Sequence, residues 1–304
     1  MGRVNRRCKK SSATEPVERR ASGTRRARPL RLVSNDCCNN YLVTVFSATA
    51  MMPLSTIDEK FAAWIAALDG RYLADLTVPE VSRALRALSS CYVERRDKLA
   101  SGEALGSAGK RAAFALYYAP LHFLVSQHLV RALGGASGLE GIVDVGCGTG
   151  AAGAAWALEA GGVEVTGYDR HPWAVAESSW TYRSLGLHGR GRQADAARVK
   201  LPQHAGAAVI VAYCANELPP PVRSALLPRL LTVGERGGRV LVIEPIARRT
   251  SPWWGEWVTA FTRAGGRADE WRFRAPLPAR QTQLARAAGL DIRELTARSL
   301  YLAT

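Results

Sequence analysis

Short apolar stretches alternate with longer helical segments from residue 141 onward, and this alternation constrains the fold more than any other feature. The intervening segments run to about 10–15 residues, as in helices that join parallel strands. Such an order predicts a parallel sheet with helices on both faces. The expected strands are Ile142–Val145, Glu164–Tyr168, Gly191–Ala194, Ala207–Tyr213, Arg239–Ile243, Glu270–Phe273 and a stretch within Asp291–Leu302; the expected helices are Ala151–Ala160, Trp173–Leu185, Pro220–Leu231, Trp253–Ala264 and Ala279–Ala288.

The fold class that follows is α/β, with a doubly wound, mostly parallel seven-stranded sheet. The last two expected strands lie close together in the sequence, so we expect an antiparallel edge there. This domain would span residues 136–304.

Residues 51–135 carry helical rather than strand periodicity. Apolar residues recur at spacings of three and four from Phe61 to Leu68, which places them on one face of a helix capped by Ser55. A second helix follows, and then a long helix over Gly109–Leu133 that Pro120 would kink. These helices would form an N-terminal helical cap.

Residues 1–50 form a basic segment with eleven Lys and Arg residues against three acidic ones. Its composition predicts a disordered extension. Two other interpretations are a secretory signal, because Ala48-Thr49-Ala50 resembles a cleavage site, and an Arg/Ser-rich transit peptide. We prefer the interpretation in which the ordered protein starts near Met51 or Met52.

The whole chain has a formal net charge of +15 at pH 7. Such a balance permits binding to RNA or another anionic partner, although an Arg-rich solvated surface has the same composition. No apolar run reaches the roughly 18–20 residues of a membrane span. The six cysteines have no C-x-x-C spacing, so we expect no zinc or redox motif and a cytoplasmic location.

Three glycines at alternate positions, Gly146, Gly148 and Gly150, follow the first expected strand. A strand, a glycine turn and a helix N-terminus together make a site for an anionic or polar ligand. In a doubly wound sheet, ligands bind beyond the carboxyl ends of the strands. Three further strand ends carry suitable groups: Asp169, Asp195 and the segment Ala212–Leu218.

The run Val143–Gly150 resembles motif I of class I S-adenosylmethionine-dependent methyltransferases. The resemblance covers residues 140–304 and implies the Rossmann-like methyltransferase fold, with S-adenosyl-L-methionine as cofactor. It implies that the glycines wrap the methionine part of the cofactor, that Asp144 orients the loop or accepts from the cofactor's amino group, and that Asp169 accepts from both ribose hydroxyls. Asp195 with Ala196 would bind the adenine amino group. The implied cofactor-binding set is Asp144, Gly146, Cys147, Gly148, Gly150, Asp169, Arg170, Asp195 and Ala196.

The resemblance also implies that Tyr213, Asn216 and Glu217 border the transferred methyl group, and these are the candidate catalytic residues. Methyl transfer depends mainly on in-line positioning and needs a base only if the acceptor must lose a proton before attack. Glu217 would be that base or would hold the loop. Glu244 is a further acceptor-side candidate, as is His171, which would otherwise simply begin a helix.

A dinucleotide site is the main alternative. Gly146-x-Gly148-x-x-Ala151 fits the G-x-G-x-x-G/A pattern, and Asp169 follows at about the 20-residue spacing of that pattern. Asp144 stands where dinucleotide-binding strands usually carry an apolar residue, and Gly150 adds a third alternate glycine. Both details favour the methyltransferase.

A narrower resemblance concerns the Rsm22-like ribosomal small-subunit methyltransferase relatives. It is carried by Ala113–Pro120, by Asn216-Glu217-Leu218 and by Val242–Pro245, and it implies an RNA acceptor or the small subunit as partner. The cysteine cluster that some of those relatives use for an iron–sulfur centre has no counterpart here. Asn216–Pro219 also departs from the Asn-Pro-Pro-aromatic box of the methyltransferases that act on amino groups of nucleic acids. The acceptor atom therefore stays open as O, N or C, on RNA or on a small molecule.

Basic and aromatic residues adjoin in Ala247–Trp257. This mixture suits an RNA or flat-ring substrate, or else its tryptophans pack on the core. A non-catalytic ribosome-assembly or RNA-binding protein that retains the fold is a second class of function. A nicotinamide-dependent oxidoreductase is a third.

Overall fold

The computed structural model describes residues 56–94, 105–247, 251–290 and 292–303. These residues belong to one compact unit that spans residues 52–304. The expectations for residues 1–50, for Ser55 as a helix cap and for Arg248–Thr250 lie outside the described residues.

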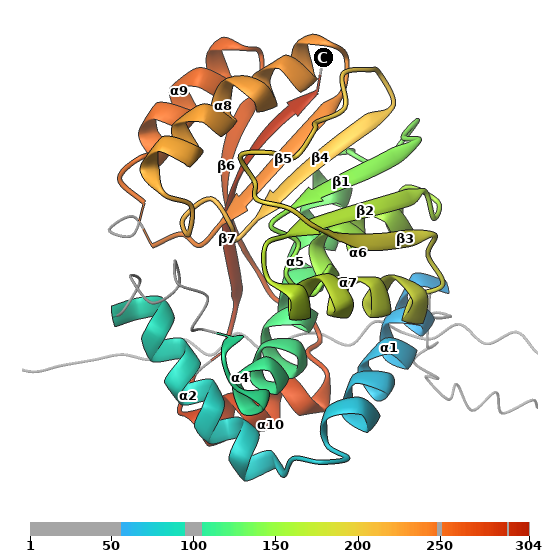
Figure 1. Ribbon diagram of the computed structural model, residues 1–304, viewed down its shortest axis with the longest axis vertical. Helices are drawn as coiled ribbons and strands as arrows, with labels where there is room; N and C mark the ends of the chain where they lie inside the picture. Colours follow the sequence, from blue (N-terminus) through green and yellow to red (C-terminus); the bar gives the residue numbers. More distant parts are fainter. Residues whose placement is uncertain (1–55, 95–104, 248–250, 291, 304) are drawn as a thin grey trace, which may run out of the picture. The chain divides into compact units, whose positions relative to one another are not determined.

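A seven-stranded sheet runs through the unit in the order β3-β2-β1-β4-β5-β7-β6 (Figure 1). The first five strands are parallel, and β7 runs antiparallel to both β5 and β6. The predicted doubly wound sheet is confirmed, as is its antiparallel edge. The strands are β1 (Gly141–Val145), β2 (Glu164–Asp169), β3 (Gly189–Gln193), β4 (Ala207–Ala212), β5 (Arg239–Glu244), β6 (Arg267–Phe273) and β7 (Leu295–Ala303).

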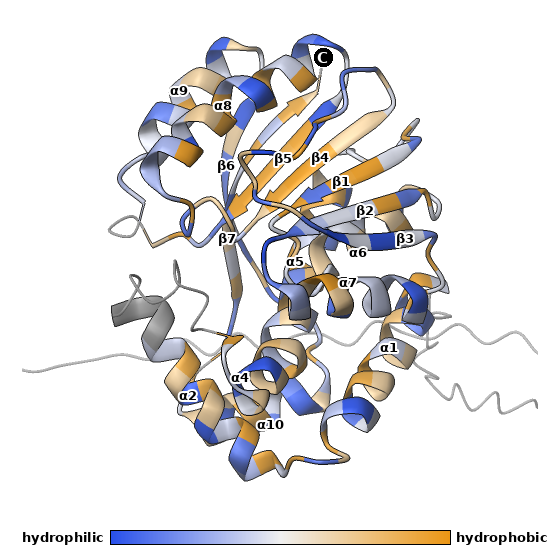
Figure 2. Cartoon of the chain, in the orientation of Figure 1, coloured by the Kyte–Doolittle hydropathy of each residue, from blue (hydrophilic) through white to orange (hydrophobic). Residues whose placement is uncertain are grey.

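The central strands are largely apolar (Figure 2). Their successive residues point to opposite faces of the sheet, and both faces are apolar. On β4, Ala208 and Ile210 lie in one buried cluster, whereas Val209 and Val211 lie in the other. The first cluster includes residues of α5 (Ala119–Ala132), α6 (Ala151–Glu159) and α7 (Pro172–Ser184). The second includes residues of α8 (Pro220–Glu235) and α9 (Trp254–Arg263).

Helices α1 (Thr56–Tyr72), α2 (Val78–Glu94), α4 (Ala108–Ala113) and η2 (Phe114–Tyr118) precede α5. The long helix expected over Gly109–Leu133 is present, but a π-helical turn, η2, interrupts it just before Pro120. Helix α10 (Ala279–Ala288), far away in the sequence, packs on α2 and η2. Residues from both parts of the chain therefore surround η2. The domain boundary at residue 136 stays a prediction.

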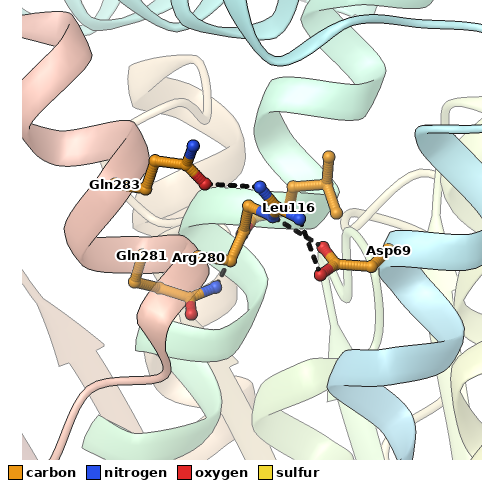
Figure 3. A network of polar contacts seen from close by, with 5 residues as sticks. All are labelled: Asp69, Leu116, Arg280, Gln281 and Gln283. Carbon is orange, nitrogen blue, oxygen red and sulfur yellow. Dashed lines mark hydrogen bonds and ion pairs between the residues drawn. The ribbon is translucent and has the colours of Figure 1, made fainter.

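Helix α10 supplies a hydrogen bond that the π-helical region lacks. Pro120 has no N–H, so the carbonyl of Leu116 loses the donor that an α-helix would give it. The side-chain amide of Gln281 donates to this carbonyl over 2.6 Å (Figure 3). Next to it, Arg280 donates to both carboxylate oxygens of Asp69 on α1, at 3.0 and 3.1 Å. Helix α10 thus ties α1 and η2 together.

Candidate functional site

Strand β1 ends in a loop whose backbone conformation favours glycine. Gly146, Gly148 and Gly150 have φ angles of +69°, +52° and +77°, where an L side chain is strained. Space is short as well, because a Cβ on Gly146 would overlap Cys214 and one on Gly150 would lie 2.7 Å from the Tyr182 ring. Both the conformation and the packing therefore require glycine at these positions of the glycine loop, residues 146–150, which precedes α6.

Asp144 lies beneath this loop and is 1% exposed. Its Oδ2 accepts a hydrogen bond from the N–H of Gly153 in α6, at 3.0 Å. Gly153 permits this approach, since a Cβ there would lie 2.7 Å from the same oxygen. Burial and, to a smaller extent, the charge of Asp169 raise the pKa of Asp144 to about 7, although the hydrogen bond from Gly153 acts in the opposite direction. Asp144 thus fastens the start of α6 to β1.

Asp169 joins the ends of β1 and β2. Its Oδ2 accepts from the N–H of Gly148 at 3.0 Å, and its Oδ1 accepts from the N–H of His171 at 2.8 Å. The side chain is half-buried, and each carboxylate oxygen keeps a second lone pair. His171 caps α7, with its Nδ1 accepting from the N–H of Trp173 at 3.2 Å.

The remaining cofactor-side candidates lie around the ends of β2 and β3. Arg170 is exposed, and its carbonyl accepts from Gln193 Nε2 at 3.0 Å. Asp195 is also exposed, and its Oδ1 accepts from the N–H of Ala197 at 2.8 Å in a turn. Arg229 of α8 donates to the carbonyl of Ala196 at 3.2 Å, which holds the connection from β3 to β4.

Cys147 is one of the buried residues of the glycine loop. A Cβ on Gly167 of β2 would lie 2.7 Å from its sulfur, so the thiol packs against the backbone of the neighbouring strand. Burial raises the pKa of this thiol, and the nearby charges of Asp144 and Asp169 add to the effect. Cys147 thus fills space beneath the loop as a neutral thiol.

Asn216 lies at the centre of a hydrogen-bond network at the ends of β4 and β5. Its backbone N–H and its Nδ2 donate to the two carboxylate oxygens of Glu244, at 3.1 and 2.6 Å. Its Oδ1 accepts from Ser251 Oγ at 2.5 Å and from Trp253 Nε1 at 2.9 Å. Glu244 is completely buried. The network ties the segment after β4 to β5 and to the start of α9.

Tyr213 and Glu217 flank this network along the chain. Tyr213 has a φ of +55°, the one positive value among the non-glycine residues that the structure describes. Strained backbone of this kind clusters at ligand sites. Burial raises the pKa of the Tyr213 hydroxyl, as does the charge of Glu244, so the hydroxyl keeps its proton. The N–H of Glu217 donates to the carbonyl of Cys214 at 2.9 Å and closes a turn.

An aromatic cluster lies beside the glycine loop, and the sequence analysis did not identify it. We call it the aromatic wall; its members are Phe114, Tyr118, His122, Trp173 and Tyr213. His122 stacks on Tyr213 with ring centroids 4.0 Å apart and planes at 14°. The ring of Phe114 would lie 3.5 Å from a Cβ on Gly148. The four-residue spacing of Phe114, Tyr118 and His122 was the signal for this cluster, because it places them along one helical face.

Two of the three tryptophans in Ala247–Trp257 pack on the core, as one of the two interpretations expected, and Trp254 is half-buried. Trp253 and Trp257 are 8% and 1% exposed, and both belong to the cluster beneath α8 and α9. The guanidinium of Arg223 lies over the Trp253 ring, 5.2 Å from its centroid. These two rings therefore stabilise the fold and are not free to stack on a substrate.

The carboxyl ends of β1 and β2 bring together Asp144, Asp169 and the loop glycines. Tyr213 stacks on His122 of the aromatic wall, which lies beside the same loop. Within the described ranges, no group of three or more His, Cys, Asp or Glu side chains is arranged to hold a metal ion. In the same part of the chain, no helix is long and apolar enough to cross a membrane.

Comparison with known proteins gives one family match and several similar structures. Residues 142–238, from β1 to the turn before β5, match the family described as "Methyltransferase domain". No curated protein matched the sequence. The structure is similar to an S-adenosylmethionine-dependent methyltransferase from Aquifex aeolicus, with 16% identity over 60% of this chain and 90% of that one and a TM-score of 0.42. It is also similar to magnesium protoporphyrin IX methyltransferase from Synechocystis with bound S-adenosylmethionine, with 14% identity, coverage of 60% and 80%, and a TM-score of 0.39. Similarity at this level does not extend to a substrate.

Residues 142–238 thus match a methyltransferase domain, and S-adenosylmethionine is the cofactor that the resemblance of Val143–Gly150 implies. The residues present fit that cofactor. Gly146 and Gly148 of the glycine loop are half-buried and carry no side chain, and the Asp169 carboxylate against the loop has lone pairs left for hydroxyl groups. The Rsm22-like relationship is not established by the matched family, whose description names no substrate.

Proposed function

We propose that this protein transfers a methyl group from S-adenosyl-L-methionine to a nucleophilic oxygen, nitrogen or carbon. The observation that carries the proposal is the hydrogen bond from the Gly148 N–H to Asp169 at 3.0 Å. It holds a carboxylate suited to ribose hydroxyls against the glycine loop. When bound, the cofactor supplies a methyl group on a positively charged sulfur.

On the cofactor side, the backbone of Gly146, Gly148 and Gly150 would wrap the methionine part. Asp169 would accept from the ribose hydroxyls, and Asp195 with the backbone of Ala196 would bind adenine. Asp144 would act through the loop, because its carboxylate accepts a hydrogen bond from Gly153 in α6. Cys147 in the glycine loop and Arg170 after β2 would contribute backbone groups to cofactor binding.

On the acceptor side, Tyr213 and Glu217 are the groups that we assign to the methyl acceptor. Tyr213 keeps its proton, so its hydroxyl donates a hydrogen bond to the acceptor. Glu217 takes a proton where the acceptor must lose one before attack. Asn216 is a positioning residue, because Glu244, Ser251 and Trp253 already bind its amide.

The acceptor that we propose belongs to RNA in a ribosomal context or is a small molecule. An RNA partner, as in the Rsm22-like relatives, is supported by the net charge and by edge strand β3. Gly189 and Gly191 of β3 face α7, where a Cβ would overlap its residues, and the alternating Arg190 and Arg192 are exposed. Exposed arginines in a row suit a phosphate backbone. We propose a cytoplasmic location.

A non-catalytic RNA-binding or ribosome-assembly protein is the alternative proposal, and the same arginines favour it. Labelled methyl transfer from the cofactor to small-subunit RNA and to a metabolite extract separates the two. Incorporated label supports the enzyme. Cofactor binding without transfer to either fraction supports the non-catalytic protein. Binding of a nicotinamide dinucleotide in place of S-adenosylmethionine refutes both.

A further inference from the structure

We propose that the aromatic wall receives a flat, uncharged aromatic ring that carries the methyl-accepting atom, an inference that rests on the proposed function. The shared chemistry is a planar heteroaromatic ring. Its two sources are a nucleobase of RNA and a free heteroaromatic metabolite.

The position of the wall is the first argument. Its rings come from η2 and α5, from the start of α7 and from the end of β4, and they converge beside the glycine loop. Phe114 contacts the space over Gly148. Trp173 follows the His171 cap that Asp169 holds, and Tyr213 follows β4. A ring resting on the wall therefore lies beside the loop from which the methyl group is delivered.

The exposure of the wall is the second argument. The largest aromatic side chains of the core, such as Trp64, Trp156 and Tyr182, are fully buried. The five wall rings contact one another, but each is only half-buried. Aromatic side chains gain most from complete burial. Half-buried aromatic faces at a strand-end site stack well on other rings, since every flat ring has a π-face.

The charge of the wall is the third argument. Burial lowers the pKa of His122 to about 3, so the ring is neutral at physiological pH. Tyr213 is likewise neutral. An anionic acceptor group would lose solvation against these rings without gaining a partner, whereas a neutral ring loses little.

The backbone strain at Tyr213 is the fourth argument. A positive φ in a tyrosine persists only where the surroundings enforce it. The parallel stack with His122 at 4.0 Å and the hydrogen bond from its N–H to Ile243 at 2.8 Å hold the residue in place. Its ring is therefore fixed before any acceptor binds.

The test uses the full chain saturated with S-adenosylhomocysteine, so that the cofactor site is filled. Saturation-transfer NMR with free nucleosides and with indole reports binding of flat rings, and cyclohexylamine and cyclohexanecarboxylate are the non-planar probes. We expect the flat probes to bind and His122→Leu to weaken them by about tenfold, the scale of one lost stacking contact. Calorimetry should show cofactor affinity changed less than about twofold in the same variant.

Helix α5 offers a matched control. His128 stacks on Phe273 with centroids 3.8 Å apart and planes at 10°, a pair like His122 and Tyr213 but set against β6. Phe273→Leu should leave probe binding and methyl transfer unchanged. Equal loss in Phe273→Leu and His122→Leu would assign the effect to general loosening of α5 and overturn the inference.

The remaining outcomes separate this inference from the proposed function. Mass spectrometry of labelled products should find the methyl group on a ring, in RNA for the nucleobase source or in the metabolite fraction for the free source. Methyl groups on aliphatic acceptors alone, or no binding of flat probes, overturn the inference while leaving methyl transfer intact. Flat probes that bind without any transfer refute the proposed function and support the site as a binding site. Weaker cofactor binding in His122→Leu with unchanged probe binding assigns the wall to the cofactor and overturns the inference.

Discussion

Gln281→Leu tests the hydrogen bond by which α10 satisfies the interrupted helix. The substitution keeps the approximate volume of the side chain and removes its amide. The carbonyl of Leu116 then has neither the Gln281 donor nor an N–H from Pro120. The carbonyl lies in a buried contact, so water does not easily replace the lost donor.

The expected loss follows from this burial. Leaving one buried polar group unsatisfied costs about 1–3 kcal/mol. Gln281 is 1% exposed, and its Oε1 is buried without a hydrogen-bond partner among the described residues. Leucine removes that unsatisfied acceptor too, which offsets part of the loss. We therefore expect the free energy of unfolding to fall by about 1–2 kcal/mol, near the lower end of that range.

Urea unfolding of the full chain measures this loss, and thermal unfolding should show a Tm lower by about 2–4 °C per kcal/mol. Gln283→Leu is the matched control. Gln283 lies on the same helix but is exposed, with its Oε1 accepting from Arg280 at 2.5 Å, so its substitution should change stability by less than about 0.5 kcal/mol.

Pro120→Ala completes a double-mutant cycle. Alanine supplies a backbone N–H four residues after Leu116, which can donate to the same carbonyl. The cost of Gln281→Leu should therefore shrink in the Pro120→Ala background. A cost that is equal in both backgrounds, or a Gln281→Leu variant as stable as Gln283→Leu, would refute the reasoning.

Three further predictions concern the site. Asp169→Ala should weaken S-adenosylmethionine binding by about 1–3 kcal/mol, because polar partners are left unpaired; unchanged affinity by calorimetry contradicts the assignment. Burial raises the pKa of Asp144 to about 7, above the roughly 3.9 of an unfolded chain, so the native state binds this proton more tightly. The free energy of unfolding should then fall as pH rises from about 4 to 7, and Asp144→Asn should reduce this pH dependence. Urea unfolding at several pH values measures it, and an equal pH dependence in the variant would contradict the assignment. RNA affinity should fall steeply with added salt, and the double variant Arg190→Glu, Arg192→Glu should lower both the affinity and its dependence on salt. An unchanged salt dependence would show that RNA does not bind at these two arginines.

The sheet and the glycine loop follow from local patterns. Each strand is a short apolar or alternating run, and the carboxyl ends of β1 and β2 must meet because parallel neighbours share an edge. The contact between Gly148 and Asp169 is thus a consequence of two strand ends that the sequence places correctly.

The Gln281 hydrogen bond and the Asn216 network could not be read in this way. Gln281 meets Leu116 from 165 positions away, and no periodicity links them. Pro120 gave one indication, because a proline inside a helix leaves a carbonyl in need of an outside donor. Ser251 and Trp253, which donate to the amide oxygen of Asn216, come from beyond β5. Such contacts depend on how distant elements dock, which spacing along the chain does not encode.

The place of β7 inside the sheet has a consequence for how the chain is made. Strand β5 acquires its neighbour β4 as soon as it leaves the ribosome, but its other neighbour is synthesised only after α9, β6 and α10. During that interval the apolar edge of β5, Val240–Ile243, has no strand to pair with and offers hydrogen bonds to any other nascent chain. We expect yield in cells to depend on how quickly residues 295–303 reach that edge, and a chaperone that shields strand edges to raise the yield more than a lower growth temperature does.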